Sequence, residues 1–127
     1  DSSLFLTVSF WEGIDAPGNT LWLVIIVKLH FEVPSDHVYM ARSSYIDQHS
    51  DRGSFMTLTV PNAVIKMKQG VGRLIRNEED KGIVMILDGR IVKKSYRHTM
   101  FSSLPEGYYP EDTMVENIPS KIENFLY

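Results

Sequence analysis

The sequence predicts an α/β fold in which a parallel β-sheet is flanked by helices. Three short apolar runs, at residues 4–10, 21–29 and 83–87, show no alternation of polar and apolar side chains. Runs of this kind are typical of strands that are buried on both faces of a parallel sheet. Two helical patterns lie between the second and the third run. Strands that alternate with helices indicate an α/β architecture with right-handed crossovers.

The first helix is expected to follow Asp36, a favoured N-cap residue, and to run to about His49. A turn should come next at residues 51–54, where Asp, Arg, Gly and Ser occur together, and Gly18 and Asn19 indicate an earlier turn. The apolar side of the helix is expected to comprise Val38, Ala41, Tyr45 and Ile46.

The second helix contains Pro61, which suits its first turn because a missing N–H costs little there. At about 100° per residue, Gln69, Arg73 and Arg76 fall within an arc of roughly 60°, and Lys66 joins the same stripe. Apolar surface elsewhere on this helix is expected from Val64, Ile65, Val71, Leu74 and Ile75.

The pattern weakens beyond residues 104–107, where Leu, Pro, Glu and Gly indicate a turn. We therefore expect one domain over residues 1–107 and a C-terminal tail over residues 108–127. A short helix is expected at residues 119–126 of the tail. Its docking residues would be Ile122, Phe125 and Leu126.

The composition excludes several classes of site. Of the 127 residues, 43% are hydrophobic and none is cysteine, so the chain can form one small core but no thiolate zinc site and no iron–sulfur cluster. The net charge of −3 means that any contact with nucleic acid must be local. The longest apolar run, residues 21–27, is too short to cross a bilayer. No signal-peptide pattern is present, so a cytoplasmic protein without a membrane partner is expected.

The stripe on the second helix favours contact with phosphate groups. Guanidinium groups are planar, always charged and suited to bidentate recognition of phosphate. Gly70 and Gly72 each cost the helix about 1 kcal/mol relative to alanine, so they need a reason such as a close backbone approach. The alternative is a basic helix face that pairs with acids of a neighbouring element.

A second candidate site is the loop at residues 10–18, which directly follows the first apolar run. Its acids, Glu12 and Asp15, come after the carboxyl end of a predicted parallel strand, where open α/β sheets bind ligands. The alternative is a solvated connection that contains turn residues.

Other polar residues carry weaker signals. The histidines have no metal-ligand spacing, and no metal site is expected. Residues 93–98 form a basic patch around Lys93, Lys94 and Arg97, for which a solvated helix start and a contact with phosphate both remain open. The chain has no phosphate-loop motif and no acidic pair typical of a magnesium site, so it cannot hydrolyse a nucleotide unaided.

Five blocks in order resemble one known family. They read FWEGIDAPG, LVIIVKLHFEVPSD, VPNAVIKMKQGVGRLIR, DKGIVMILDGRI and FSSLP, and they extend over residues 4–105. This order is similar to that of the C-terminal helicase lobe of the DinG family, which are XPD-like superfamily-two DNA helicases of bacteria. The resemblance implies part of a RecA-like lobe of the P-loop NTPase type. His30, His37 and Arg97 depart from the residues usual in that family, in loops outside the two motifs below.

The resemblance also implies roles for matched residues. Trp11, Glu12, Gly13 and Asp15 would stand in helicase motif V, which lies between nucleotide and DNA and couples them. Gln69, Gly72, Arg73 and Arg76 would stand in motif VI. There, Gln69 and Arg73 would face the nucleotide phosphates and Arg76 would be the arginine finger. The DNA side would comprise Trp11, Lys93, Lys94 and Arg97.

The implied cofactors are ATP and Mg²⁺, with Mg²⁺ held by an N-terminal lobe that is missing here. Single-stranded DNA and that lobe are the implied partners. A chain of this kind would be inert alone, and an exposed sheet edge would favour self-association. The alternative function is a non-catalytic regulatory module of a DinG-like exonuclease.

Overall fold

The computed structural model describes residues 21–75 and 80–127 of the chain. The chain divides after Asp88 into two compact units, Asp1–Asp88 and Gly89–Tyr127. The boundary between the units lies inside the domain expected from the sequence. The apolar run at residues 4–10, the loop at residues 10–18 and Arg76 lie outside the described residues.

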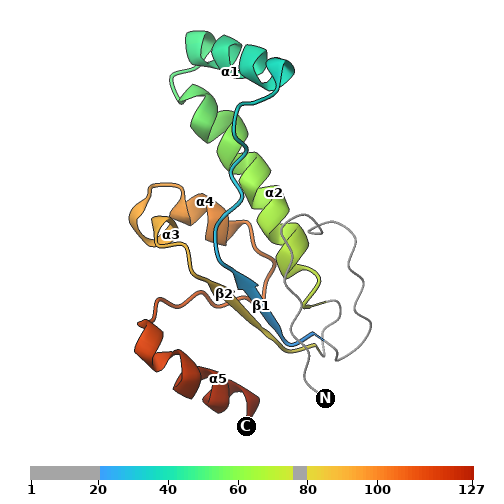
Figure 1. Cartoon of the computed structure of the whole chain (residues 1–127), viewed down its shortest axis with the longest axis vertical. Coiled ribbons are helices and arrows are strands. Elements are labelled where there is room, and N and C mark those ends of the chain that lie inside the picture. Colours follow the sequence, from blue (N-terminus) through green and yellow to red (C-terminus); the bar gives the residue numbers. More distant parts are fainter. Residues whose placement is uncertain (1–20, 76–79) are drawn as a thin grey trace. The chain divides into compact units, whose positions relative to one another are not determined.

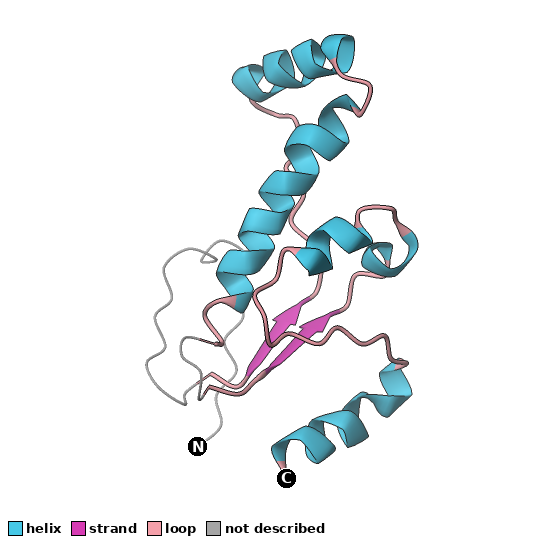
Figure 2. Cartoon of the chain, turned by 180° about the vertical axis from the view of Figure 1, so that it is seen from behind, coloured by secondary structure: helices cyan, strands magenta, loops and turns pink. Residues whose placement is uncertain are grey.

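Two parallel strands form the sheet of the first unit. β1 (Leu23–Ile26) pairs with β2 (Ile83–Ile86) in register, Leu23 beside Ile83 and Ile26 beside Ile86. Figure 2 shows the two strands side by side. The predicted parallel pairing is confirmed, as is the long crossover of helices between the strands that Figure 1 shows.

The strands are less buried than the sequence predicts. Only Ile26 is fully buried, and Ile25 remains 43% exposed. Val27 and Leu87, which follow the strands, are also exposed. The expected burial on both faces is therefore wrong for the described residues. The sheet has two strands there, and a pair of strands offers few neighbours to cover its faces.

Helix α1 (His37–His49) begins as predicted. The Asp36 carboxylate accepts the backbone N–H groups of Val38 and Tyr39, both at 3.4 Å, which is the contact expected of an N-cap. The predicted apolar side, by contrast, is confirmed only at Ile46, which is half-buried. Val38, Ala41 and Tyr45 are exposed, and no residue of α1 is fully buried.

Polar contacts explain which face of α1 packs instead. The Tyr39 hydroxyl lies 2.5 Å from the Thr59 hydroxyl, and the Asp47 carboxylate accepts the Ser54 N–H at 2.6 Å and the Ser54 hydroxyl at 3.0 Å. These bonds turn the face that contains Tyr39 and Asp47 toward the following helix. Of the apolar side chains predicted to pack, Ile46 shares this face, whereas Val38, Ala41 and Tyr45 are left on the outside.

A π-helical turn, Phe55–Thr59, precedes α2 (Val60–Val71) without a break in the helical backbone. Its N–H···O bond from Val60 to Phe55 spans five residues, which is a widened turn. Pro61 follows directly and cannot donate a backbone hydrogen bond. The position of Pro61 in the first turn of α2 is thus confirmed, although helical backbone already precedes it.

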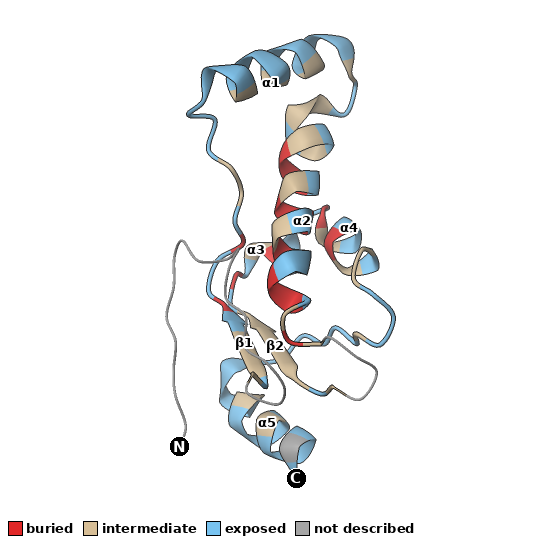
Figure 3. Cartoon of the chain, turned by 90° about the vertical axis from the view of Figure 1, so that its right-hand side faces the viewer, coloured by how far each residue is buried: buried red, intermediate tan, exposed pale blue. Residues whose placement is uncertain are grey.

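One face of α2 is buried throughout its length, as Figure 3 shows. The spacing of the buried residues is that of a single helical face. They are Val60, Ala63, Val64, Met67, Gly70 and Val71.

The chain returns from α2 to β2 through a close contact. A Cβ atom placed on Gly82 would lie only 2.5 Å from Cγ of Leu74, whose side chain is buried. Gly82 directly precedes β2, so Leu74 is packed against the amino end of that strand. Only glycine leaves room for this contact.

The second unit is helical. The Arg97 guanidinium binds both carboxylate oxygens of Asp112, at 3.0 and 2.9 Å, and lies over the ring of Phe101. The C-terminal helix expected from the sequence is present, but Phe125 is half exposed. The elements of this unit are α3 (Arg90–Lys93), α4 (Arg97–Ser102), a 3₁₀ turn (Val115–Asn117) and α5 (Ile118–Leu126).

Among the described residues, no helix is long and apolar enough to cross a membrane.

Candidate functional site

The candidate site contains the last turn of α2 and the turn after it. Gln69 is exposed on the last turn of the helix, and Arg73 is half-buried two residues beyond the helix end. The structure therefore places these two predicted site residues in one short segment. Arg76 lies outside the described residues, and so do the motif V candidates Trp11, Glu12, Gly13 and Asp15.

The predicted helix does not continue as far as Arg73, and Arg76 is not described. Helix α2 ends at Val71, and the N–H groups of Arg73 and Leu74 bond to carbonyl groups only three residues back, Gly70 at 3.3 Å and Val71 at 3.0 Å. Bonds of this span tighten the backbone into a 3₁₀-type turn. The direction of Arg73 is consequently set by the turn rather than by the period of α2.

The two glycines of this segment have different surroundings. Gly70 is buried in the last turn of α2, whereas Gly72 caps the helix and is exposed. A Cβ atom on Gly72 would lie 3.0 Å from the carbonyl oxygen of Lys68. Gly72 therefore allows a close approach of the chain to its own backbone, and the poor helix propensity of both glycines helps to end α2 here.

Leu74 fixes this segment in place. Its buried side chain fills the space beside Gly82, directly before β2. Arg73 and Gln69 thus sit between a packed helix and a packed anchor. The backbone that carries both side chains is therefore fixed by packing, which favours a site that recognises phosphate.

Lys66 was predicted to belong to the phosphate-contacting stripe, but in the structure it pairs with a carboxylate of the same chain. Its Nζ lies 3.1 Å from a carboxylate oxygen of Glu32, and Asn62 donates a hydrogen bond of 3.1 Å to the other oxygen. Lys66 and Asn62 are one turn apart on α2, so both reach the same carboxylate. The alternative of a salt-bridged helix face is therefore correct for Lys66.

The same contacts lower the pKa of Glu32 below its ordinary value of 4.5. The hydrogen bond from Lys66 is the main cause, and partial burial of the carboxylate opposes it. A lowered pKa means that the folded state favours the ionised carboxylate. The stabilisation is present at neutral pH and is lost as the pH falls through the lowered pKa.

We expect Glu32→Gln to destabilise the chain by about 0.5–1 kcal/mol at pH 7, because both partners are partly exposed to solvent. The difference between variant and wild type should shrink as the pH falls through the lowered pKa of Glu32, because the carboxyl of the folded chain is then protonated as well. Urea unfolding at several pH values measures this. A destabilisation that stays constant from neutral pH down to the most acidic pH at which the chain still folds would contradict the assignment, and Asp51→Asn, on an exposed carboxylate, is the control.

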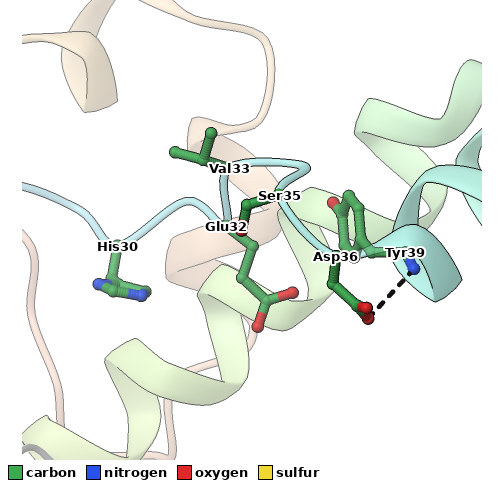
Figure 4. A pocket seen from close by; sticks show the side chains of 6 residues that line it. All are labelled: His30, Glu32, Val33, Ser35, Asp36 and Tyr39. Carbon is green, nitrogen blue, oxygen red and sulfur yellow. Dashed lines mark hydrogen bonds between the residues drawn. The ribbon is translucent and has the colours of Figure 1, made fainter.

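A shallow hollow of about 370 Å³ lies beside this ion pair. Figure 4 shows that Glu32 and Asp36 contribute its carboxylates. Both carboxylates already serve the fold, Glu32 through Lys66 and Asp36 as the N-cap of α1. The hollow is therefore not the candidate site. Its lining residues are His30, Glu32, Val33, Ser35, Asp36 and Tyr39.

Asp88 is a functional candidate that the sequence reasoning missed. It lies two residues beyond the carboxyl end of β2, is 8% exposed, and accepts the backbone N–H of Leu29 at 3.0 Å. Leu29 follows the carboxyl end of β1, so this carboxylate links the ends of both strands. The rule that drew attention to Glu12 and Asp15, an acid just after a parallel strand, could have identified Asp88 as well.

The basic patch on the second unit divides into two kinds of residue. Lys93 and Lys94 are exposed, Lys93 at the end of α3 and Lys94 directly after it. Arg97 is committed to Asp112 and Phe101. Within the described ranges, no group of three His, Asp or Glu side chains could hold a metal ion.

Comparison with known proteins gives one family. Residues 1–107 match the family described as the helicase C-terminal domain. The chain is 47% identical over 104 residues to the ATP-dependent DNA helicase YoaA of Escherichia coli, covering 80% of this chain and 16% of that protein.

Two further relatives carry the DinG name. The ATP-dependent DNA helicase DinG of Photobacterium profundum is 45% identical over 104 residues, which is 82% of this chain and 15% of the relative. The 3'-5' exonuclease DinG of Bacillus subtilis is 40% identical over 99 residues, 78% of this chain and 10% of the relative. The chain thus spans only a small part of the length of the relatives it matches.

Proposed function

The chain belongs to the helicase C-terminal domain family, with DinG-type relatives, and from this premise we propose that it is the C-terminal motor-lobe part of an ATP-dependent DNA helicase. In this role, it couples ATP hydrolysis to movement along single-stranded DNA. ATP binds between this lobe and an N-terminal lobe. The chain alone is inactive, because it has no phosphate-loop motif.

One observation carries the proposal. Gln69 and Arg73 occupy a short segment that is held between the buried face of α2 and the contact of Leu74 with Gly82. An exposed glutamine amide and the guanidinium of a half-buried arginine are donors of the kind that bind the oxygens of a polyphosphate. Gln69 and Arg73 would bind the phosphates of ATP, and Arg76, three residues on, would stabilise the charge of the transferred group.

Mg²⁺ supplies charge neutralisation at the phosphates when it is bound. The assignment of this ion to the N-terminal lobe follows from the likeness to the helicase family and is part of the proposal. Motif V, with Glu12, Gly13 and Asp15, would couple the nucleotide to DNA, and Trp11 would lie on the DNA side.

The basic patch contributes to DNA binding through Lys93 and Lys94, which are exposed. Arg97 fits this role less well, because its guanidinium already binds Asp112. The exposed apolar residues near the strand ends, Val27 and Leu87, favour self-association of the isolated chain, which sedimentation velocity at rising concentration would detect.

The experiment is a comparison of ATP turnover in the presence and absence of single-stranded DNA, with the longer protein that contains this chain. We expect turnover to rise with DNA and a labelled strand to be displaced from a duplex. A DNA-insensitive protein that degrades the strand would instead favour a regulatory module in an exonuclease. That alternative is supported by the likeness to a relative described as a 3'-5' exonuclease.

A further inference from the structure

Helix α1 packs through only one of its faces. Tyr39, Ser43 and Ile46 are half-buried and fall within an arc of about 60°. Apart from these three residues, the helix is exposed along its whole length. Figures 1 and 2 place it at the end of the first unit that is farthest from the strands, and Figure 3 shows it almost wholly exposed.

A second stripe lies about a quarter turn away from the packed face. Val38, Arg42, Tyr45 and His49 also fall within an arc of about 60°, and all four are exposed. Val38 and Tyr45 are each 64% exposed, which is high for side chains with so much apolar surface. We call these four residues the outer stripe.

The two aromatic rings of the outer stripe are already ordered. The Tyr45 and His49 rings stack with centroids 4.2 Å apart and an angle of 21° between their planes. Nδ1 of His49 lies 2.8 Å from the Tyr45 carbonyl oxygen, a hydrogen bond that fixes the imidazole beside the phenol. A flat partner that binds here finds the rings in place, so little side-chain entropy is lost on binding.

The charges of α1 favour an anionic partner on the outer stripe. Within the described part of the chain, the Arg42 guanidinium has no carboxylate partner, and it lies one turn before Tyr45. The one acid of the helix, Asp47, lies on the other side and is engaged by Ser54. The outer stripe thus combines stacked aromatic rings with a cation and contains no acid. Flat bases joined by phosphates match this combination.

We propose that the outer stripe binds single-stranded DNA, with an unpaired base stacked on the Tyr45–His49 pair and Arg42 at a neighbouring phosphate. This assignment rests on the proposed function, since it places on α1 a contact for the single-stranded DNA along which the helicase would move. It adds a stacking site to the phosphate contacts proposed for Lys93 and Lys94. Stacking is tolerant of sequence, because every base has a π face.

The test measures the affinity of the longer protein for a dye-labelled oligothymidine by fluorescence anisotropy. Tyr45→Ala should weaken binding by about 5- to 100-fold, the loss of one stacked base. Tyr45→Phe, which keeps the ring, should stay within about twofold of wild type. The matched control is Met40→Ala, since Met40 is exposed on the opposite side of α1. It should leave the affinity unchanged.

The salt dependence separates the two kinds of contact. Arg42→Ala should reduce the slope of log affinity against log salt by about 0.7, the value for one phosphate contact on a single strand. Tyr45→Ala should leave the slope unaltered, because it removes no charge. Circular dichroism confirms that each variant is folded.

The outcomes distinguish this inference from the proposed function. Wild type that does not bind single-stranded DNA would overturn both. Wild type that binds, together with a Tyr45→Ala variant of unchanged affinity, would overturn only the role of the outer stripe. A Tyr45→Ala variant that binds DNA normally but has lost self-association would assign the outer stripe to a protein interface and also contradict the inference.

Discussion

Arg76→Ala in the longer protein is expected to lower ATP turnover by about 10³-fold or more, while the affinity for ATP changes only a few-fold. An arginine finger acts on charge that develops in the transition state, so its loss lowers the rate of the chemical step rather than ground-state binding. Steady-state hydrolysis in the presence of single-stranded DNA gives the turnover. Equilibrium binding of a fluorescent ATP analogue gives the affinity.

The controls come from the same segment. Lys68→Ala removes an exposed cation from the last turn of α2 and should leave turnover unchanged. Arg73→Ala should weaken nucleotide binding as well as turnover, because Arg73 is proposed to bind the phosphates in the ground state. If Arg76→Ala turns over ATP at the wild-type rate, Arg76 is not the finger.

The sequence predicted those elements that local signals determine. Asp36 caps α1, Pro61 stands in the first turn of α2, and both apolar runs among the described residues contain strands. Each of these features depends on side chains within a few residues of one another. The parallel pairing followed from the order of the elements, because strands joined by long helical crossovers run parallel.

The packed face of α1 could not be predicted in this way. A helical pattern shows where apolar side chains gather, but the orientation of α1 is set by Tyr39 with Thr59 and by Asp47 with Ser54. The Tyr39 contact joins residues 20 positions apart. Polar contacts across such distances leave no periodic trace in a sequence, so of the predicted apolar side only Ile46 packs.

The site shows the same division. The structure places Gln69 exposed and Gly72 at the helix end, and their role at a nucleotide stays a prediction. Lys66 pairs with Glu32, 34 positions earlier. The sequence predicted only that the basic helix face could pair with some acid of a neighbouring element, not which acid. No local sequence pattern distinguishes a lysine that binds phosphate from one that neutralises a distant acid, since both lie on a half-exposed helix face.

Asp88→Ala is expected to destabilise the chain by about 1–3 kcal/mol, because it leaves the buried N–H of Leu29 without its acceptor. The lost bond joins the carboxyl ends of β1 and β2, and two strands have few other contacts to hold this end in register. Asp88→Asn retains an oxygen that can accept the N–H, so its loss of stability should be smaller. Urea unfolding of the 127-residue chain, followed by circular dichroism, measures both variants.

Hydrogen exchange locates the effect of Asp88. The Leu29 amide should exchange faster in Asp88→Ala than in the wild type. Amides in the middle of α2 should slow or speed up only as much as the global free energy of unfolding changes. Asp51→Ala removes an exposed carboxylate from the same unit and is the matched control. If Asp88→Ala is as stable as Asp51→Ala and protects Leu29 equally, Asp88 does not tie the strands together. In that case, a loss of activity without a loss of stability in the longer protein would show that the Asp88 carboxylate binds a ligand.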